Sequence, residues 1–147
     1  MKSLKRAAIG LILLVVVIAI GLTVWEPLST EQSAPPPEGS YEARIVRDEF
    51  GVPHIFGKTD PDVAYGVAYA HSEDDFGTLQ EVIAMVRGRM ATLKGADSAP
   101  IDYIGALLDV RGTVTRQYDD LPADVRALLD GYASGLNAYA ADRPEEV

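Results

Sequence analysis

Few side chains in this sequence have the types and spacing that catalysis requires, and Ser40 is the first candidate. Ser40 follows Gly39, and a small residue before a serine suits an autocatalytic cut that frees the α-amine as a base for the serine hydroxyl, the nucleophile. Ser40, however, stands at the end of a proline-rich spacer and ahead of the folded part of the chain. We therefore interpret it as a spacer residue and not as a nucleophile.

A second candidate combines His71 with Glu73, Asp74 and Asp75, since imidazole and carboxylate groups are common metal ligands. A simpler interpretation is that Ser72 caps a helix and the three carboxylates lie in its first turn. Carboxylates at that place stabilise the positive end of the helix dipole. His71 then lies at the junction of two helices, and we predict no metal site.

The remaining candidates are interpreted as structural. His54 is expected in a strand with no serine or carboxylate visibly paired with it, which favours a hydrogen-bonded structural histidine over a general base. Arg87 and Arg89 flank Gly88 inside an expected helix, where glycine favours close approach of another backbone and the arginines form ion pairs. Asn137 is expected to hydrogen-bond a neighbouring segment. We thus predict no catalytic, substrate-binding or metal-ligating residue in this chain.

Charge and cysteine content exclude several classes of protein. The 147 residues carry a formal charge of −9, and three of the basic residues precede position 7, so the sequence from Glu26 onward has 10 basic against 22 acidic residues, or −12. Such an acidic surface repels phosphate backbones and argues against nucleic acid as a partner. The absence of cysteine excludes disulfides, thiolate metal sites and a cysteine nucleophile.

The first 40 residues differ from domain sequence. Residues 1–6 are basic, and residues 7–25 form an uncharged run whose helix would span roughly 28 Å, close to the thickness of a bilayer core. We predict a cytoplasmic basic segment followed by an uncleaved transmembrane anchor or signal-anchor, because no small-x-small cleavage site follows the run. Residues 26–40 contain Pro35–Pro37 and predict a semi-rigid spacer. Everything after Glu26 should lie outside the cytoplasm, on the periplasmic or extracellular side.

Residues 41–147 have the pattern of an α+β domain. Short extended runs at residues 42–46 and 52–56 flank turn residues and predict one β-hairpin, with Pro53 at a strand start or edge. Capping residues and prolines predict several helices. The expected helices cover residues 60–70, 72–95, 101–118 and 120–144. A lone hairpin is marginal in water, so we expect it to need strands that this chain does not contain.

Two apolar stripes at helical spacing are expected to face the core. The first runs along the helix that ends at Gly95 and comprises Leu79, Val82, Ile83, Val86, Met90 and Leu93. The second runs along the last helix and comprises Val125, Leu128, Leu129, Tyr132, Leu136 and Tyr139.

Motifs along this domain resemble the start of the α-chain of the penicillin acylase family, which includes acyl-homoserine-lactone acylases. The matching runs are residues 45–48 (IVRD), 51–55 (GVPHI), 65–74 (YGVAYAHSED), 87–91 (RGRMA) and 131–139 (GYASGLNAY). Each run is short, but their common order and spacing make the combination specific. Many relatives have arginine where this chain has Asp75, which weakens assignment to one subfamily.

The resemblance implies an N-terminal-nucleophile hydrolase with a four-layer αββα fold, made by autocatalytic cleavage of a precursor. Its nucleophile is the first residue of the β-chain, usually serine, and its own α-amine acts as the base. Later α-chain segments supply part of the acyl pocket and a calcium ligand. None of these groups matches a position among the 147 residues, so we expect no cofactor in this chain, although calcium belongs to the complete family fold.

The sequence thus predicts a helix-rich N-terminal part of an amidase that cleaves linear N-acyl bonds and is inactive alone. Its expected partners are the remainder of the α-chain, the β-chain, the membrane and an acyl-amide substrate. The competing hypothesis is a non-catalytic, membrane-tethered helical module that binds a partner outside the cytoplasm.

Overall fold

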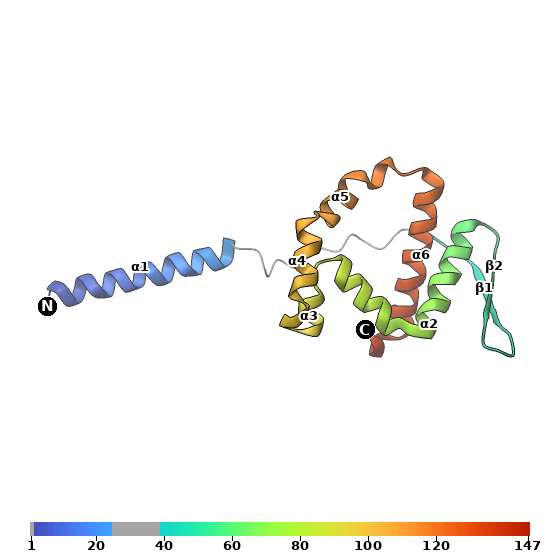
Figure 1. Ribbon diagram of the computed structural model, residues 1–147, viewed down its shortest axis with the longest axis horizontal. Coiled ribbons are helices and arrows are strands. Elements are labelled where there is room, and N and C mark those ends of the chain that lie inside the picture. Colours follow the sequence, from blue (N-terminus) through green and yellow to red (C-terminus); the bar gives the residue numbers. More distant parts are fainter. Residues whose placement is uncertain (1, 25–38) are drawn as a thin grey trace. The chain divides into compact units, whose positions relative to one another are not determined.

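The computed structural model of the chain describes residues 2–24 and 39–147 (Figure 1). Within residues 2–24 the description extends to the side chains of Arg6 and residues 10–21. The chain divides into two compact units, Met1–Pro35 and Pro36–Val147, and each is described by itself. Of the predicted spacer, residues 26–38 lie outside the described residues.

The first unit contains one helix, α1 (Lys2–Val24), where the sequence predicts a helix. The described side chains of residues 10–21 are exposed. In the described part of the chain, no helix combines the length and the apolar character that a membrane crossing needs. The helix is therefore confirmed, while the predicted transmembrane anchor at residues 7–25 has no support from the structure.

The second unit begins with the predicted hairpin, formed by β1 (Ala43–Arg47) and β2 (Pro53–Gly57). The strands are antiparallel, and Ile45 lies opposite Ile55. The turn forms because Asp48 Oδ1 accepts hydrogen bonds from the Phe50 and Val52 N–H groups at 2.9 and 3.0 Å. Both strands lie one residue later than predicted, and proline occupies a strand start as expected.

One face of the hairpin packs on the next helix, α2 (Asp60–Val86). Gly66 of α2 makes this possible, because a Cβ there would lie 2.6 Å from Ile55 Cγ2 and 2.8 Å from Ala43 Cβ. On the opposite face Val46 and Phe56 are exposed. The sheet of the described residues has two strands and is supported by a helix on one face, while the expected additional strands from outside this chain stay a prediction.

Helix α2 starts with a complete capping box. Thr59 Oγ1 accepts a hydrogen bond from Asp62 N at 3.3 Å, and Asp62 Oδ2 accepts one from Thr59 N at 3.0 Å. Asp62 Oδ1 also accepts a hydrogen bond from Glu42 N at 3.0 Å, which ties the start of the hairpin to the start of the helix. The sequence pattern Asp60-Pro61 indicates Asp60 as the N-cap of this helix, but Thr59 occupies that position and Asp60 is the first helical residue.

The predicted break between two helices at Ser72 is also wrong. Ser72 is buried inside α2, where its hydroxyl donates to the Ala68 carbonyl at 2.8 Å. The helix instead kinks at Asp75, whose backbone is non-helical and whose Oδ1 accepts a hydrogen bond from Thr78 N at 3.1 Å. Asp75 therefore caps the second half of α2, which is the role that the sequence assigns to Ser72.

Helix α2 ends nine residues before the predicted end at Gly95. Gly88 has a φ of 65°, its N–H donates to the Met85 carbonyl, and the Arg89 N–H donates to the Ala84 carbonyl. This pair of hydrogen bonds is a Schellman motif, which requires a left-handed residue that glycine supplies without steric cost. Gly88 is thus a helix terminator, and the prediction of a glycine inside a helix is wrong.

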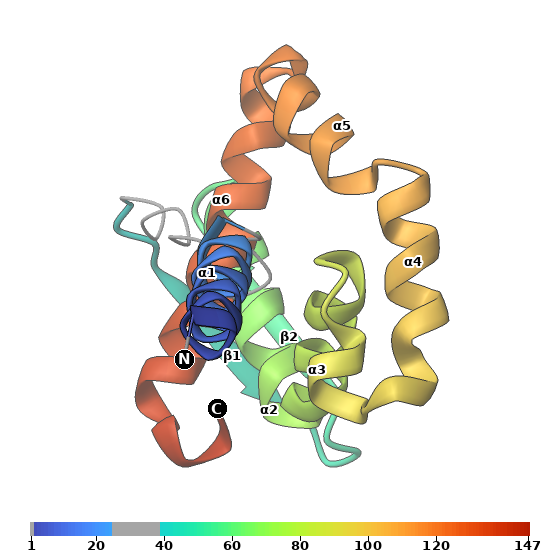
Figure 2. The ribbon, with the colours of Figure 1, turned by 90° about the vertical axis from the view of Figure 1, so that its left-hand side faces the viewer.

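The next segment consists of short helices: α3 (Met90–Lys94), the 3₁₀ turn η1 (Ala96–Ser98), α4 (Ala99–Leu107) and α5 (Val110–Gln117). A single helix over residues 101–118 was expected, but Asp109 has a φ of 47° and separates α4 from α5. Asp102 of α4 accepts hydrogen bonds from Met90 N and Ala91 N at 2.7 and 2.8 Å, so it caps α3. We call residues 90–117 the arch, because Figure 2 shows them leaving α2 and returning toward α6.

After the turn η2 (Tyr118–Asp120), helix α6 (Ala123–Asp142) confirms the last predicted helix, and the turn η3 (Pro144–Glu146) follows it. Helix α6 packs closely on α2 through two buried glycines. A Cβ on Gly131 would collide with the Pro61 carbonyl oxygen, and one on Gly135 would collide with the Tyr65 carbonyl oxygen. The two helix backbones can approach this closely because both positions lack a side chain.

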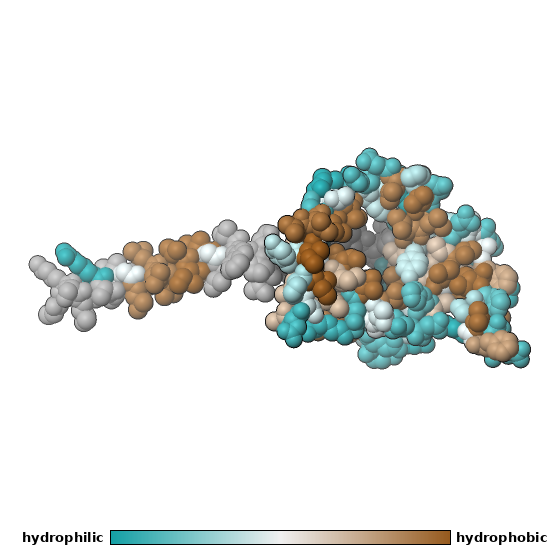
Figure 3. Space-filling view, viewed as in Figure 1, coloured by the Kyte–Doolittle hydropathy of each residue, from teal (hydrophilic) through white to brown (hydrophobic). Residues whose placement is uncertain are grey.

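The core lies between the hairpin, α2 and α6. Ala68, Ala70, Phe76 and Tyr139 are its buried apolar residues, and the Phe76 and Tyr139 rings lie 5.1 Å apart. Much of both predicted stripes lies outside this core. The exposed members are Val82, Val86, Leu93, Val125, Leu128 and Leu129. Figure 3 shows apolar side chains gathered on the surface of the arch.

Candidate functional site

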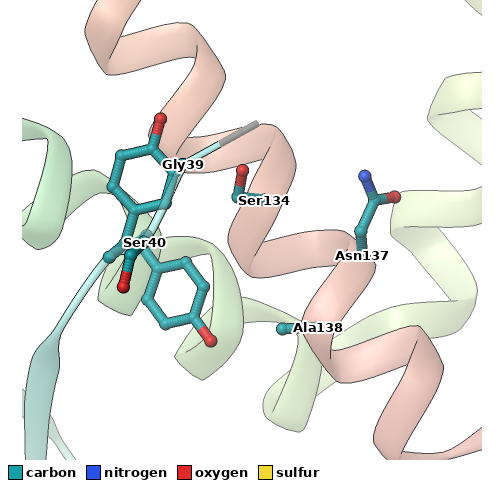
Figure 4. A pocket seen from close by; sticks show the side chains of 7 residues that line it. Gly39, Ser40, Ser134, Asn137 and Ala138 are labelled. Atoms are coloured by element: carbon teal, nitrogen blue, oxygen red, sulfur yellow. The ribbon is translucent and has the colours of Figure 1, made fainter. Parts of the chain in front are cut away.

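A surface hollow lies beside Ser40, where three segments distant in sequence meet (Figure 4). Its volume is about 440 Å³. The lining residues come from the segment before β1, from α2 and from α6. They are Gly39, Ser40, Tyr41, Tyr65, Ser134, Asn137 and Ala138. The Tyr41 and Tyr65 rings stack with their centroids 5.9 Å apart and an angle of 18° between the planes.

The hollow offers polar contacts without a means of activating a nucleophile. Ser40 is exposed, and no described histidine or carboxylate lines the hollow beside it. The Ser134 hydroxyl oxygen is buried without a hydrogen-bond partner among the described residues. Asn137 is exposed and makes no hydrogen bond with a described residue, so its predicted hydrogen bond to a neighbouring segment is not found. The site can hold a group by stacking and hydrogen bonding, but it lacks a base.

A second, smaller hollow of about 310 Å³ lies at the open end of the hairpin. The Arg44 guanidinium lies 4.4 Å from the centroid of the Phe56 ring, a cation–π contact. Lys58 Nζ donates to Glu42 Oε2 at 2.9 Å, and this hydrogen bond raises the pKa of Lys58. The lysine and glutamate form an exposed ion pair at this hollow.

An ionic cluster around Arg47 joins the hairpin to α2. Arg47 Nη2 lies 2.9 Å from Glu73 Oε2 and 2.8 Å from Asp74 Oδ1, and Arg47 also donates to the carbonyls of Gly51 and Ala70. The hydrogen bonds to Glu73 and Asp74 raise the pKa of the Arg47 guanidinium. The prediction that Glu73 and Asp74 occupy the first turn of a helix is wrong, since they lie before the kink of α2 and bind Arg47.

His54 is a hydrogen-bonded histidine, as predicted, but its partner was missed. His54 Nε2 lies 3.0 Å from Asp48 Oδ2 across the base of the turn. This hydrogen bond lowers the pKa of Asp48, and the Val52 and Phe50 N–H groups lower it further. The pair stabilises the turn and does not face a nucleophile among the described residues.

His71 lies inside α2, and not at a junction between helices. Its Nδ1 lies 3.1 Å from the Tyr132 hydroxyl of α6. The three carboxylates that follow it in sequence have other partners, Arg47 for two of them and Thr78 for Asp75. Among the residues that the structure describes, no group of three or more potential ligands could hold a metal ion.

Arg87 and Arg89 are exposed at the end of α2. Neither guanidinium makes an ion pair with a carboxylate in the described part of the chain, so the predicted ion pairs are not found. In the same neighbourhood Lys94 pairs with Glu81, which joins α3 to α2. Arg87 and Arg89 therefore do not join elements of this unit through ion pairs with described residues.

Comparison with known proteins assigns most of the chain to one family. The family model described as penicillin amidase matches residues 42–147, which include the hairpin, α2, the arch and α6. The chain belongs to the penicillin amidase family. The family resemblance predicted from the five motifs is thereby confirmed.

Two curated relatives illustrate the extent of the similarity. Acyl-homoserine lactone acylase PvdQ of Pseudomonas fluorescens is 30% identical over 127 residues, which are 81% of this chain and 16% of that protein. Penicillin acylase 2 proenzyme of Pseudomonas sp. is 29% identical over 115 residues, which are 78% of this chain and 15% of that protein. The chain thus spans about a sixth of the length of these relatives.

A solved structure supports the same assignment for the fold. The thermostable penicillin G acylase from Alcaligenes faecalis superposes with a TM-score of 0.63 and 28% sequence identity. The match covers 74% of this chain and 60% of that chain. The helix-rich unit with its small antiparallel sheet is therefore a penicillin-acylase-like fold.

Sequence reasoning missed the residues that shape the hollow, above all Tyr65 and Ser134. Both lie within matched motifs, but a motif does not show which of its side chains meet across helices. The spacing of Gly131 and Gly135 was an available signal, since two small residues four positions apart mark a close helix contact.

Proposed function

We propose that this chain is the N-terminal part of the α-chain of an acylase that hydrolyses linear N-acyl amides, and that the nucleophile comes from elsewhere in that protein. The observation that carries the proposal is the family match over residues 42–147. Relatives are named for penicillins and acyl-homoserine lactones, so we propose an acyl amide of one of these classes as the substrate.

The reaction adds water across an amide C–N bond and yields a carboxylic acid and an amine. A serine hydroxyl must attack the carbonyl carbon, and it is a poor nucleophile until a base accepts its proton. In the arrangement that the family implies, the base is the α-amine of that serine, and hydrogen-bond donors stabilise the tetrahedral oxyanion. Ser40 lines a hollow without a described histidine or carboxylate and lies before the family match at residues 42–147, so we propose a scaffold role for this chain.

The scaffold role rests on contacts between elements. Arg47 joins the hairpin to α2 through Glu73 and Asp74, and the glycines of α6 hold it against α2. Such fixed elements can support a site that other segments complete. Calcium, which the resemblance implies for the complete fold, does not fit the described residues, because they contain no cluster of three or more potential ligands. We assign no step to it.

Activity measurements on two forms of the protein test the proposal. The purified chain should release no acyl group from penicillin G, phenylacetyl amides or acyl-homoserine lactones, whereas the full protein encoded by the gene should hydrolyse at least one of them. Turnover by residues 1–147 alone, abolished by Ser40→Ala, would overturn the scaffold role. Inactivity of the full protein toward all three classes would overturn the proposed reaction.

The competing hypothesis of a self-sufficient binding module stays a prediction. A self-sufficient domain buries its large apolar side chains, whereas several on α4 are exposed here, which favours the acylase reading.

We further propose that residues 41–147 lie outside the cytoplasm, with residues 7–25 as a membrane anchor. Support comes from the sequence, in which basic residues precede an uncharged run and mark the cytoplasmic side. Cell fractionation with alkaline carbonate extraction tests this. We expect the chain in the membrane pellet and digested by protease added from outside, and recovery in the soluble cytoplasmic fraction would reject it.

A further inference from the structure

Helix α4 carries its large apolar side chains on one face, and that face is exposed. Its large apolar side chains, together with that of the residue that caps its C-terminus, are Ile101, Tyr103, Ile104, Leu107 and Leu108. We call these five side chains the α4 surface. Tyr103, Leu107 and Leu108 retain 66%, 67% and 66% of their accessible surface. Contiguous exposed apolar side chains mark association surfaces, so this face is expected to have a covering.

The single charged residue of α4 does not make the helix polar toward solvent. Asp102 directs its carboxylate to the N-terminus of α3, where it accepts hydrogen bonds from Met90 N and Ala91 N. The rest of α4 is uncharged. A partner of the α4 surface therefore needs apolar side chains and no complementary charge.

We infer that the α4 surface is a docking face for another part of the same acylase, a polypeptide surface of apolar side chains that covers this face of α4. This inference rests on the proposed function. On this inference, the chain joins the remainder of the enzyme at α4, and the arch forms the interface.

The lengths of the relatives support this occupant. The matched regions are 12% to 18% of the curated acylases, so most of each relative lies outside the part that this chain resembles. In the solved penicillin G acylase chain, the superposed part is 60%. An acylase therefore has ample further polypeptide to cover a helix, and stable interfaces of standard size need only about 800 Å² from each partner.

Two other occupants fit the α4 surface less well. Helices that lie on a bilayer carry Lys or Arg beside their apolar face, whereas α4 has no basic residue and the whole chain carries −9. A second copy of the chain would bring together two molecules that each carry −9, and their mutual repulsion opposes this contact.

Photo-crosslinking in the full protein encoded by the gene tests the inference. p-Benzoylphenylalanine replaces Tyr103, an exposed aromatic residue, and a control protein carries it in place of Glu145, an exposed acidic residue of η3. We expect cross-links from position 103 to acylase peptides outside residues 1–147, with roughly tenfold higher yield than from position 145, since central apolar contacts dominate interfaces.

Three results would overturn the docking face: cross-links to residues 1–147 of another copy, adducts with phospholipid, or equal yields at positions 103 and 145. The amidase assay of the same preparation separates this failure from that of the proposed function. An active preparation with one of these results rejects the docking face alone. An inactive preparation whose cross-links lead to a protein outside the family rejects the proposed function.

A substitution provides a second measurement. Leu107→Asp should lower the yield of assembled acylase roughly tenfold or more, because a charge replaces an apolar side chain at the interface. The melting temperature of the isolated chain should stay unchanged, since Leu107 is exposed there. The control Glu145→Gln should assemble like the wild type. Normal assembly of the Leu107→Asp protein would contradict the docking face.

Discussion

The hairpin with α2 and α6 differs from the arch in how its helices meet. In the first region, Gly131 and Gly135 bring helix backbones into close contact, Gly66 leaves room for hairpin side chains, and Phe76 packs on Tyr139. In the arch, a Cβ on Gly105 would meet nothing within 4 Å, and large apolar side chains face outward. The apolar residues of the hairpin, α2 and α6 thus stabilise a core, whereas those of the arch form a surface for association.

This difference shows that an apolar stripe at helical spacing does not by itself identify the core. The C-terminal half of α2 and the first half of α6 both have such stripes, yet Val86 and Leu129 are exposed. The residues that mark the packed region are small ones, because only they allow helices to approach. Packing and association can therefore be separated by mutation.

The largest expected effect is the removal of the aromatic core. Phe76→Ala should lower the free energy of unfolding by about 3–5 kcal/mol, since Phe76 is 9% exposed and packs on Tyr139. The arch counterpart Leu107→Ala should change it by less than about 0.5 kcal/mol. Urea unfolding followed by circular dichroism measures both. Similar losses from the two substitutions would remove the distinction between the regions.

Glycine-to-alanine substitutions in the two regions test the same difference in packing. Gly135→Ala should destabilise the chain by about 1–3 kcal/mol, because the new Cβ collides with the Tyr65 carbonyl oxygen and lies 2.9 Å from Ala68 Cβ. Gly105→Ala in α4 should stabilise it by about 0.5–1 kcal/mol, because the helix gains propensity and space is free. Thermal melts of the two proteins should shift in opposite directions, and shifts of equal sign would contradict the account.

Helix caps give a smaller difference. Thr59→Ala should cost about 1 kcal/mol, because Thr59 accepts the hydrogen bond from Asp62 N that starts α2. Ser98→Ala at the start of α4 should cost little, since the Ser98 side chain makes no capping hydrogen bond. Chemical denaturation of this matched pair checks the prediction, and an equal cost at both caps would show that the arch is held as firmly as α2.

The smallest expected effect is a dependence of stability on pH. Hydrogen bonds from His54 to Asp48, and from Glu42 N and Thr59 to Asp62, lower the pKa of both carboxyls in the folded chain. The unfolded chain therefore binds protons more readily, and stability is full above the unfolded pKa of about 3.9 and falls as pH drops through the folded pKa values. Urea midpoints measured at decreasing pH should fall, and Asp62→Asn should flatten the fall. A midpoint that rises in acid would contradict this assignment.

Elements with local signals could be predicted from the sequence. The turn between β1 and β2 depends on Asp48 and Gly51, which lie within the hairpin itself, and α6 is bounded by Pro122 and Pro144. Local capping chemistry decides such boundaries. The family, too, could be predicted, because its motifs are short runs of neighbouring residues.

Other features depend on contacts between distant residues. Ser72 and Asp75 are both capable caps, and the kink falls at Asp75 while the preceding acidic residues bind Arg47, which lies in another element. The break between α4 and α5 occurs at Asp109, a non-glycine residue with positive φ that the sequence does not signal. The hollow beside Ser40 combines three separate segments, so its lining could not be deduced from any one motif.

Hydrogen–deuterium exchange of the isolated chain tests most directly whether the molecule has one packed region and one region that needs a partner. Amides of α2 near Gly66 and of α6 near Gly131 and Gly135 should exchange at least roughly tenfold more slowly than those of α4 and α5, because local stability follows burial and packing. Equal protection of α4 and α6 would show that the arch is complete by itself, and this result would contradict the account.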